Sequence, residues 1–102
     1  MVITKGTTPT INLTVTDFEI QDTDEIHLYF SQRDRMIFKK VTPDVIINGN
    51  TVSTILTQED TFKLKKGEVK MQFRLKSPSG TIMASSEVYA EVKDVDDDDE
   101  VI

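Results

Sequence analysis

Apolar and polar residues alternate with a period of two through most of this chain. The clearest run is residues 68–76, where four apolar residues, Val69, Met71, Phe73 and Leu75, alternate with Lys70, Gln72, Arg74 and Lys76. This period is typical of a β-strand that buries one face and exposes the other. The sequence therefore predicts a strand here, with its four apolar side chains in a core.

The same pattern predicts further strands in other parts of the chain. Thr10–Thr16 would bury Ile11, Leu13 and Val15, and Glu25–Gln32 would bury Ile26, Leu28 and Phe30. Between them, Phe18 and Ile20 lie in a polar loop and are expected to fold back onto the core. Shorter strands are expected at 45–47 and 52–56.

Two more strands are predicted, at residues 36–41 and 81–93. In Met36–Val41, either Met36 and Phe38 or Ile37 and Val41 face inward. In Thr81–Lys93, the pattern places Ile82 and Ala84 on the inward face together with Val88, Ala90 and Val92. The small Ser85-Ser86 pair between these two groups indicates a bulge or a crossover to another sheet.

Turn and cap residues separate the predicted strands. Asn48-Gly49-Asn50 predicts a hairpin, because Asn and Gly tolerate the positive φ of primed turns. Ser77-Pro78-Ser79-Gly80 has Pro and Gly where a type I turn prefers them. Thr57 with Asp60 three residues later resembles a capping box, which predicts at most one short helical turn near residues 57–62.

These elements predict an all-β fold, an antiparallel β-sandwich of seven to eight short strands. We describe it as immunoglobulin-like on strand number and order alone, since the chain has no Cys and no Trp. A length of 102 residues suits one hydrophobic core. We expect a single domain over residues 1–93, followed by a flexible acidic tail at residues 94–102.

The location of the charge changes how the net charge of −6 is interpreted. Six acids and no base lie in the last nine residues: Asp94, Asp96, Asp97, Asp98, Asp99 and Glu100. The remaining 12 acids are matched by 12 lysines and arginines in residues 1–93. A neutral body with an acidic end gives no long-range attraction for nucleic acid, so we expect no nucleic-acid partner.

Residues suited to catalysis or metal binding are scarce. His27 is the only histidine and is expected on the outward face of its strand, and the lack of cysteine excludes thiolate chemistry. No phosphate-binding loop, dinucleotide fingerprint or nucleophile elbow is present. The acids at 96–100 could collect Ca²⁺, but consecutive aspartates without a bend-forming glycine favour a solvated tail. We therefore expect no enzyme activity, no cofactor and no metal.

The basic residues form three groups that have two interpretations. The groups are Lys39-Lys40, then Lys63, Lys65 and Lys66, and finally the stripe of Lys70, Arg74 and Lys76. They would form the wet face of a sheet and protect its edges, or a docking face for an acidic surface such as the tail of a neighbouring copy. The residues proposed for an interaction surface are Lys70, Arg74, Lys76, Asp96, Asp97, Asp98 and Asp99.

The first ten residues contain one lysine and no apolar run, and no stretch approaches the roughly 20 apolar residues needed to cross a bilayer. We therefore expect neither a signal peptide nor a membrane partner.

Three stretches resemble a known group of proteins: Lys5-Gly6-Thr7-Thr8-Pro9-Thr10-Ile11; then Gly49-Asn50-Thr51-Val52 running into Leu56-Thr57-Gln58-Glu59-Asp60-Thr61; and Val69-Lys70-Met71-Gln72-Phe73-Arg74-Leu75 with Ser79-Gly80 and Ala84-Ser85. In this order they resemble small β-sandwich structural proteins of phages and prophages of Gram-positive bacteria. More distantly, the layout is similar to the N-terminal domain of phage baseplate upper proteins. The resemblance covers nearly the whole chain. Baseplate upper proteins continue into a stalk, whereas this sequence stops after its acids, so we expect it to be either the platform-binding module alone or an accessory protein.

The resemblance implies a non-enzymatic tail- or baseplate-associated virion protein, assembled in the host cytoplasm, that acts through contacts with other phage virion proteins. The chain could also form a homo-oligomer. The alternative is a host-directed phage inhibitor that binds a bacterial enzyme with a contribution from the acidic tail. Carbohydrate binding is disfavoured, because only seven aromatic residues and no Trp are available to stack on sugar rings.

Overall fold

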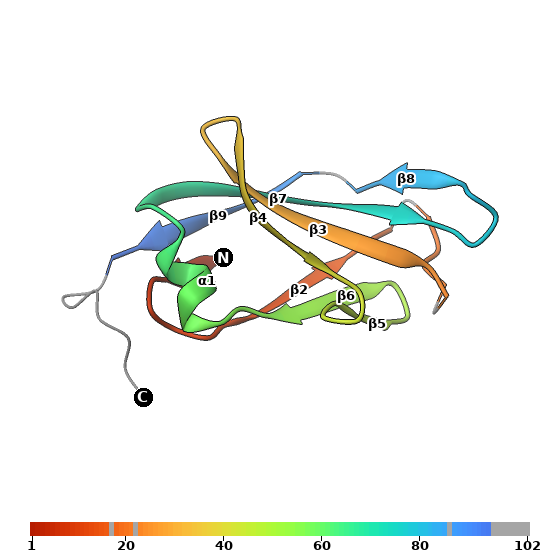
Figure 1. Ribbon diagram of the computed structural model, residues 1–102, viewed down its shortest axis with the longest axis horizontal. Helices are drawn as coiled ribbons and strands as arrows, with labels where there is room; N and C mark the ends of the chain where they lie inside the picture. The colour runs from red at the N-terminus through yellow and green to blue at the C-terminus, as the bar shows by residue number, and fades with distance from the viewer. Residues whose placement is uncertain (17, 22, 86, 95–102) are drawn as a thin grey trace.

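The computed structural model describes residues 1–16, 18–21, 23–85 and 87–94, and shows a nearly all-β protein built from two packed sheets (Figure 1). The elements in chain order are β1 (Val2–Thr4), β2 (Thr10–Thr14), β3 (Glu25–Gln32), β4 (Arg35–Val41), β5 (Ile46–Asn48), β6 (Thr51–Ile55), α1 (Gln58–Phe62), β7 (Gly67–Lys76), β8 (Ile82–Ala84) and β9 (Val88–Lys93).

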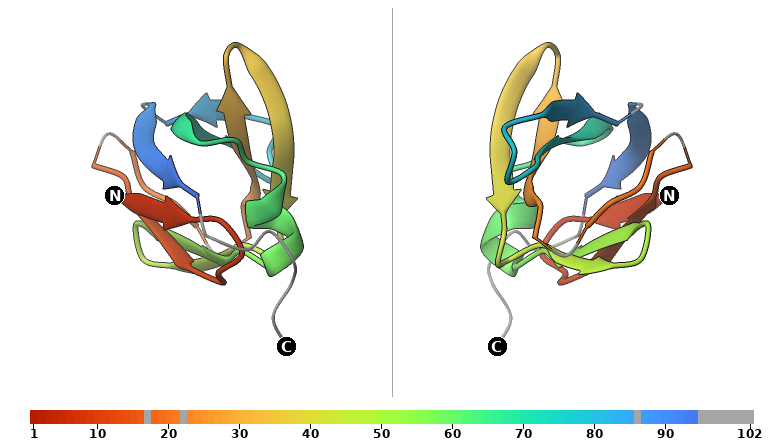
Figure 2. Two further views of the ribbon diagram at one scale, coloured as in Figure 1. Left: turned by 90° about the vertical axis from the view of Figure 1, so that its left-hand side faces the viewer. Right: turned by 90° about the vertical axis from the view of Figure 1, so that its right-hand side faces the viewer.

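The larger sheet has the strand order β1-β9-β7-β3-β4, with β8 also paired to β7, and the smaller sheet has the order β2-β6-β5. Seen end-on, the two sheets form separate layers, with α1 below β4 at one side (Figure 2). All strand pairs are antiparallel except β1 with β9, which is parallel.

The predicted all-β sandwich is confirmed. The described strands number nine rather than seven to eight, because β1 was not predicted and the last predicted strand is split into β8 and β9.

The strand order is that of a variable-type immunoglobulin sandwich. In the usual lettering, β2, β6 and β5 correspond to strands B, E and D, while β9, β7, β3 and β4 correspond to G, F, C and C′. The immunoglobulin-like description made from strand number and order is therefore confirmed, although the Cys pair and the Trp of antibody domains are absent.

One continuous core lies between the sheets, and the predicted period-two faces supply most of it. The inward residues of β3 and β7 are at most 2% exposed, namely Ile26, Leu28, Phe30, Val69, Met71, Phe73 and Leu75. From the smaller sheet come Ile11, Leu13 and Val52, and Val15 and Ile20 follow β2. Phe18 closes the core with its ring edge-on to Phe73 at 6.3 Å, so the prediction that the loop folds back is confirmed.

Strand β4 follows neither of the two predicted alternations. A register shift lies opposite Phe30 and Ser31, because Phe30 pairs with Phe38 while Ser31 pairs with Met36. The extra residue, Ile37, is half-buried, Phe38 stacks on Phe30 at 4.6 Å, and Met36 is exposed. The bulge allows adjacent residues of one strand to contact the core, which a strict period of two does not describe.

The predicted inward positions of Ile82 and Ala84 are wrong. Arg74 pairs with Ala84 whereas Met71 pairs with Val88, so the β8–β9 side has one more residue than β7 between these pairs. This one-residue bulge reverses the alternation, so Met83 faces the same side as Leu75 and Ile82 is 58% exposed. Of the two predicted explanations for Ser85-Ser86, a crossover to another sheet is excluded, since β8 and β9 pair with the same strand, and the one additional residue fits a bulge; Ser86 itself lies outside the described residues.

The turn and cap predictions are confirmed. β5 and β6 are joined at Gly49-Asn50, with φ of +60° at Gly49, and Gly80 N donates to the carbonyl of Ser77 across the predicted turn. Helix α1 begins with both hydrogen bonds of the capping box between Thr57 and Asp60. The β3–β4 turn is unusual, because both of its central residues, Arg33 and Asp34, have positive φ without being glycine.

Of the predicted acidic tail, only Asp94 is described; its carboxylate lies 3.9 Å from Lys5 Nζ. Asp96, Asp97, Asp98 and Asp99 lie outside the described residues.

Candidate interaction surface

The solvent-facing side of the larger sheet, called here the outer face, gathers side chains from five strands. Directly paired residues point to the same side of a sheet, so the register defines rows across it. The register gives five rows: Glu68–Glu91, Met36–Ser31–Lys70–Tyr89, Lys39–Tyr29–Gln72, Val41–His27–Arg74–Ala84 and Glu25–Lys76–Ile82. Strands that are distant in sequence lie side by side in this sheet (Figure 1), so the rows bring together residues that are distant in sequence.

The outer face exposes large apolar side chains as well as charges. Tyr89 is 49% exposed, Met36 56% and Ile82 58%. Tyr, Met and Arg are enriched in the centres of protein–protein interfaces relative to the rest of a surface. This composition suits contact with another protein better than contact with water alone.

The three basic residues predicted for an interaction surface occupy three outward positions of β7. Lys70 lies next to β9 and forms an ion pair with Glu87, with its Nζ 3.0 Å from a carboxylate oxygen. The hydrogen bond and negative charge of Glu87 raise the pKa of Lys70 above its usual value. Arg74 and Lys76 are exposed, and within the described part of the chain no ion pair involves either of them. The structure therefore brings the three together but leaves only two as unpaired cations.

His27 lies on the outer face, as predicted, and is half-buried between its neighbours. Its Nε2 is 3.5 Å from a carboxylate oxygen of Glu25, and its ring centroid is 6.3 Å from that of Tyr29. Across the described residues, no three His, Asp or Glu side chains gather closely enough to hold a metal ion. His27 is thus part of the polar surface of the sheet.

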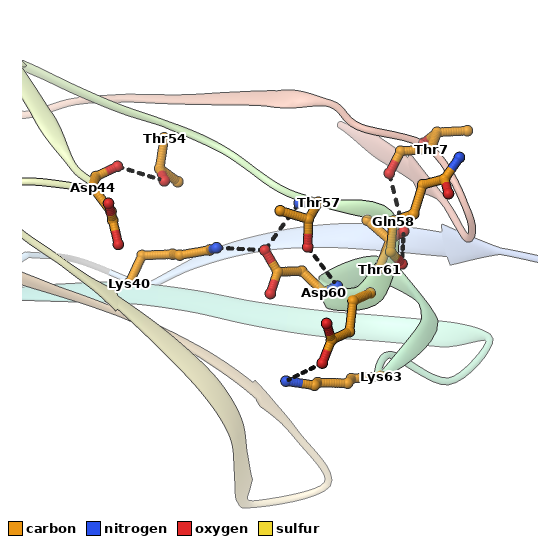
Figure 3. A network of polar contacts seen from close by, with 10 residues as sticks. Thr7, Lys40, Asp44, Thr54, Thr57, Gln58, Asp60, Thr61 and Lys63 are labelled. Atoms are coloured by element: carbon orange, nitrogen blue, oxygen red, sulfur yellow. Dashed lines mark hydrogen bonds and ion pairs between the residues drawn. The ribbon is translucent and has the colours of Figure 1, made fainter. Parts of the chain in front are cut away.

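Lys40 is the residue that sequence reasoning misplaced. It was grouped with Lys39 on the wet face, but it pairs with the inward residue Leu28 and is only 16% exposed at its side chain. Its ammonium forms an ion pair with Asp60, whose carboxylate also accepts the N–H of Thr57 (Figure 3). One feature of the sequence pointed to this inward position: Lys40 lies two residues after Phe38 and therefore on the same face of the strand.

The same network fixes the N-terminal segment against α1. The buried hydroxyl of Thr61 accepts the N–H of Gly6 at 2.9 Å. It also donates to the carbonyl of Thr7 at 3.0 Å (Figure 3). Helix α1 therefore connects β4 to the segment between β1 and β2, and it supports the sheet from its inner side rather than adding to the outer face.

The outer face of the smaller sheet differs in having no charged residue among its described strand positions, which are Thr10, Asn12, Thr14, Ile46, Asn48, Thr51, Ser53 and Ile55. Its polar side chains bond to each other, with Thr14 Oγ1 3.0 Å from Thr51 Oγ1 and Ser53 donating to Asn12 at 2.6 Å. Ile46 and Ile55 are 64% and 62% exposed. Substitutions at these two isoleucines can serve as controls for substitutions at the exposed apolar residues of the larger sheet.

In the part of the chain that the structure describes, no helix has the length and apolar character required to span a membrane.

Comparison with known proteins extends only to the fold. No family model and no curated protein matches the chain, so the resemblance to phage proteins stays a prediction. Among solved structures, the chain is similar to the V domain of amphioxus IgVJ-C2, with 12% sequence identity and a TM-score of 0.37 over 91% of this chain and 99% of that one. The chain is an all-β, immunoglobulin-like sandwich by its own strand order.

Proposed function

We propose that this chain is a non-enzymatic structural protein of a phage or prophage that binds another virion protein of the tail or baseplate. The sequence resemblance to small phage sandwich proteins motivates the biological setting. The contact itself is assigned to the outer face of the larger sheet.

The observation that carries this proposal is the mixture of side chains on the outer face. Tyr29, Tyr89, Met36 and Ile82 offer apolar and aromatic area, while Arg74 and Lys76 offer unpaired positive charge. Interfaces draw most of their binding energy from a few Tyr, Trp and Arg residues in their centres. The partner would therefore present a partly apolar surface with acidic residues opposite Arg74 and Lys76.

Supporting elements keep this face in one conformation. β3 and β7 are paired along most of their lengths, and their inward side chains are fully buried. Because a rigid sheet loses little conformational entropy when it binds, such a face suits a permanent structural contact.

The test is to induce the prophage in the bacterium that encodes the chain, purify the particles on a density gradient, and analyse them by mass spectrometry and antibody labelling. The proposal predicts that the chain is present at a fixed ratio to a tail protein. Its absence from the particles would contradict the virion role. Recovery from host lysate of a polymerase, nuclease or restriction enzyme instead would support the alternative of a host-directed inhibitor.

A further inference from the structure

A second charged feature lies at one end of the sandwich, between the β3–β4 turn and the start of β7. A cleft of about 720 Å³ opens there, called here the basic cleft, and its lining is Gln32, Arg33, Arg35, Met36, Ile37, Lys65, Lys66, Gly67 and Glu68. Four of these side chains are cations and one is an acid. The surface of the cleft therefore carries an excess of positive charge in a body that is neutral overall.

The backbone around the basic cleft is held in place, while its cations are not neutralised. The Gln32 amide accepts the N–H of Lys65 at 2.9 Å and donates to the carbonyl of Lys65 at 2.7 Å, which ties the end of β3 to the segment before β7. Among the described residues, no ion pair involves Arg33, Arg35, Lys65 or Lys66, and all four are exposed. Four cations gathered around a single acid, Glu68, repel each other, and a bound anion would relieve this repulsion.

The acidic end of the chain begins beside this cleft. Val92 of β9 pairs with Gly67, which directly follows Lys65 and Lys66. Neighbouring strands lie about 4.8 Å apart, so the far side of the cleft at β4 is about 15 Å from β9. Residues 95–102 can span at most about 28 Å when extended, which is enough to cross this distance. Asp94 itself is directed to Lys5 on the β1 side.

We propose that the basic cleft binds the acidic segment of the same chain, residues 96–100. The five consecutive acids of this segment are opposite in sign to the four cations of the cleft. Because the two are joined by a few residues, the effective concentration of the segment at the cleft is of the order of millimolar, which favours the chain's own segment over that of a second copy. An acidic surface on another protein must then displace this segment before it can reach the cleft. This inference does not depend on the proposed function.

The absence of cysteine permits a direct test with the 102-residue chain. The variant Ile102→Cys would carry a single nitroxide label at the end of the acidic segment, and broadening of backbone amide signals by the label would be measured by NMR. The proposal predicts strong broadening at residues 33–36 and 65–68, and loss of this broadening in about 1 M salt, where the screening length is about 3 Å. It also predicts that the broadening is lost when Asp96, Asp97, Asp98 and Asp99 are all replaced by Asn.

Matched charge reversals locate the binding site. Lys65→Glu with Lys66→Glu should abolish the broadening, whereas Arg74→Glu with Lys76→Glu, at the opposite end of β7, should leave it unchanged. Preserved amide dispersion in each variant would show that the sandwich is intact. A mixed sample shows whether the acidic segment comes from the same chain or from a second copy. In it, one chain is ¹⁵N-labelled without nitroxide and the other carries the nitroxide without ¹⁵N, so only contact between two copies broadens the signals. Broadening in that mixture equal to that in the single chain, or no selective broadening at the cleft, would overturn the proposal.

Discussion

The Lys40 ammonium on β4 and the Asp60 carboxylate in the first turn of α1 form an ion pair on the inner side of the larger sheet. Asp60 also accepts the N–H of Thr57, so one carboxylate closes the helix cap and connects the helix to an edge strand. The side chains of Lys40 and Asp60 are 16% and 12% exposed, so water screens the pair less than it screens a surface pair. The position of β4 thus depends on a helix of five residues.

The pair should make part of the stability depend on pH. Burial by itself would raise the pKa of Asp60, but the hydrogen bond and charge of Lys40 and the N–H of Thr57 hold that pKa below its usual value. A carboxyl whose pKa is lower in the folded chain stabilises the fold above its unfolded pKa of about 3.9, and this contribution is lost as the pH falls through the folded pKa. Urea unfolding between pH 7 and pH 3 should therefore show a loss of stability at the acid end.

Replacing Lys40 by Met should lower the free energy of unfolding by about 1–3 kcal/mol at pH 7, because Asp60 is left buried without its cation. The acid-dependent loss should also become smaller. Lys63→Met is the control, since it removes only the exposed pair with Glu59 at 3.9 Å and should change stability by less than about 0.5 kcal/mol. Equal effects of the two variants would contradict a structural role for Lys40.

Gly6 should not tolerate a side chain. It has φ of +79°, and an added Cβ would lie 2.9 Å from Cζ of Phe62 on α1. Gly6→Ala should therefore destabilise the protein by about 1–3 kcal/mol, through both backbone strain and displacement of the Phe62 ring. Gly49→Ala provides the comparison, because Gly49 has φ of +60° but open space around it, and should cost only about 1 kcal/mol. Thermal unfolding of both variants would measure the two losses of stability, and the difference between them would give the contribution of the contact with Phe62.

A substitution in the turn between β3 and β4 should stabilise the protein. Asp34 has φ of +62° and Arg33 φ of +51°, the signs of a type I′ turn, in which Asn-Gly is the preferred pair. Asp34→Gly should raise the free energy of unfolding by roughly 0.5–1 kcal/mol, because glycine adopts positive φ without steric cost. Chemical denaturation would measure this gain, and a loss of stability would mean that the Asp34 side chain contributes more than its backbone strain costs.

The bulge between β8 and β9 predicts opposite responses at adjacent residues. Ile82→Ser should change stability by less than about 0.5 kcal/mol, since Ile82 is 58% exposed. Met83→Ser should cost about 1–2 kcal/mol, because Met83 pairs with Leu75 and faces the core side. The reverse order in a denaturation series would indicate that the alternation continues unbroken through Ser85.

Period-two alternation was sufficient to predict the core wherever a strand is regular, as in β3 and β7. The alternation failed as a guide at the two bulges. One additional residue in a strand reverses the face of every residue beyond it, and the sequence pattern does not show where that residue is inserted. β1 was missed because it has only three residues and its buried face consists of Ile3 alone. Lys40 was misassigned because its partner, Asp60, is brought near only by the tertiary fold.

For the candidate surface, the sequence predicted that Lys70, Arg74 and Lys76 share one face, which follows from their spacing. It did not predict that Tyr89, Met36 and Ile82 join them, because the rows across the sheet depend on strand order and register. Ile82 precedes the bulge and Val88 follows it, so the two lie on opposite faces, and Ile82 points outward beside Lys76.

The most direct test of the outer face compares two double variants in the bacterium that encodes the chain. Ile82→Asp with Tyr89→Asp places charge on the outer face of the larger sheet, and Ile46→Asp with Ile55→Asp places the same charge at similarly exposed positions of the smaller sheet. The amount of each chain recovered in purified particles, relative to a tail protein, is then measured by mass spectrometry. The outer-face variant should be lost from the particles at least tenfold while the smaller-sheet variant is retained. Retention of the outer-face variant, or equal loss of both folded variants, would contradict the assignment.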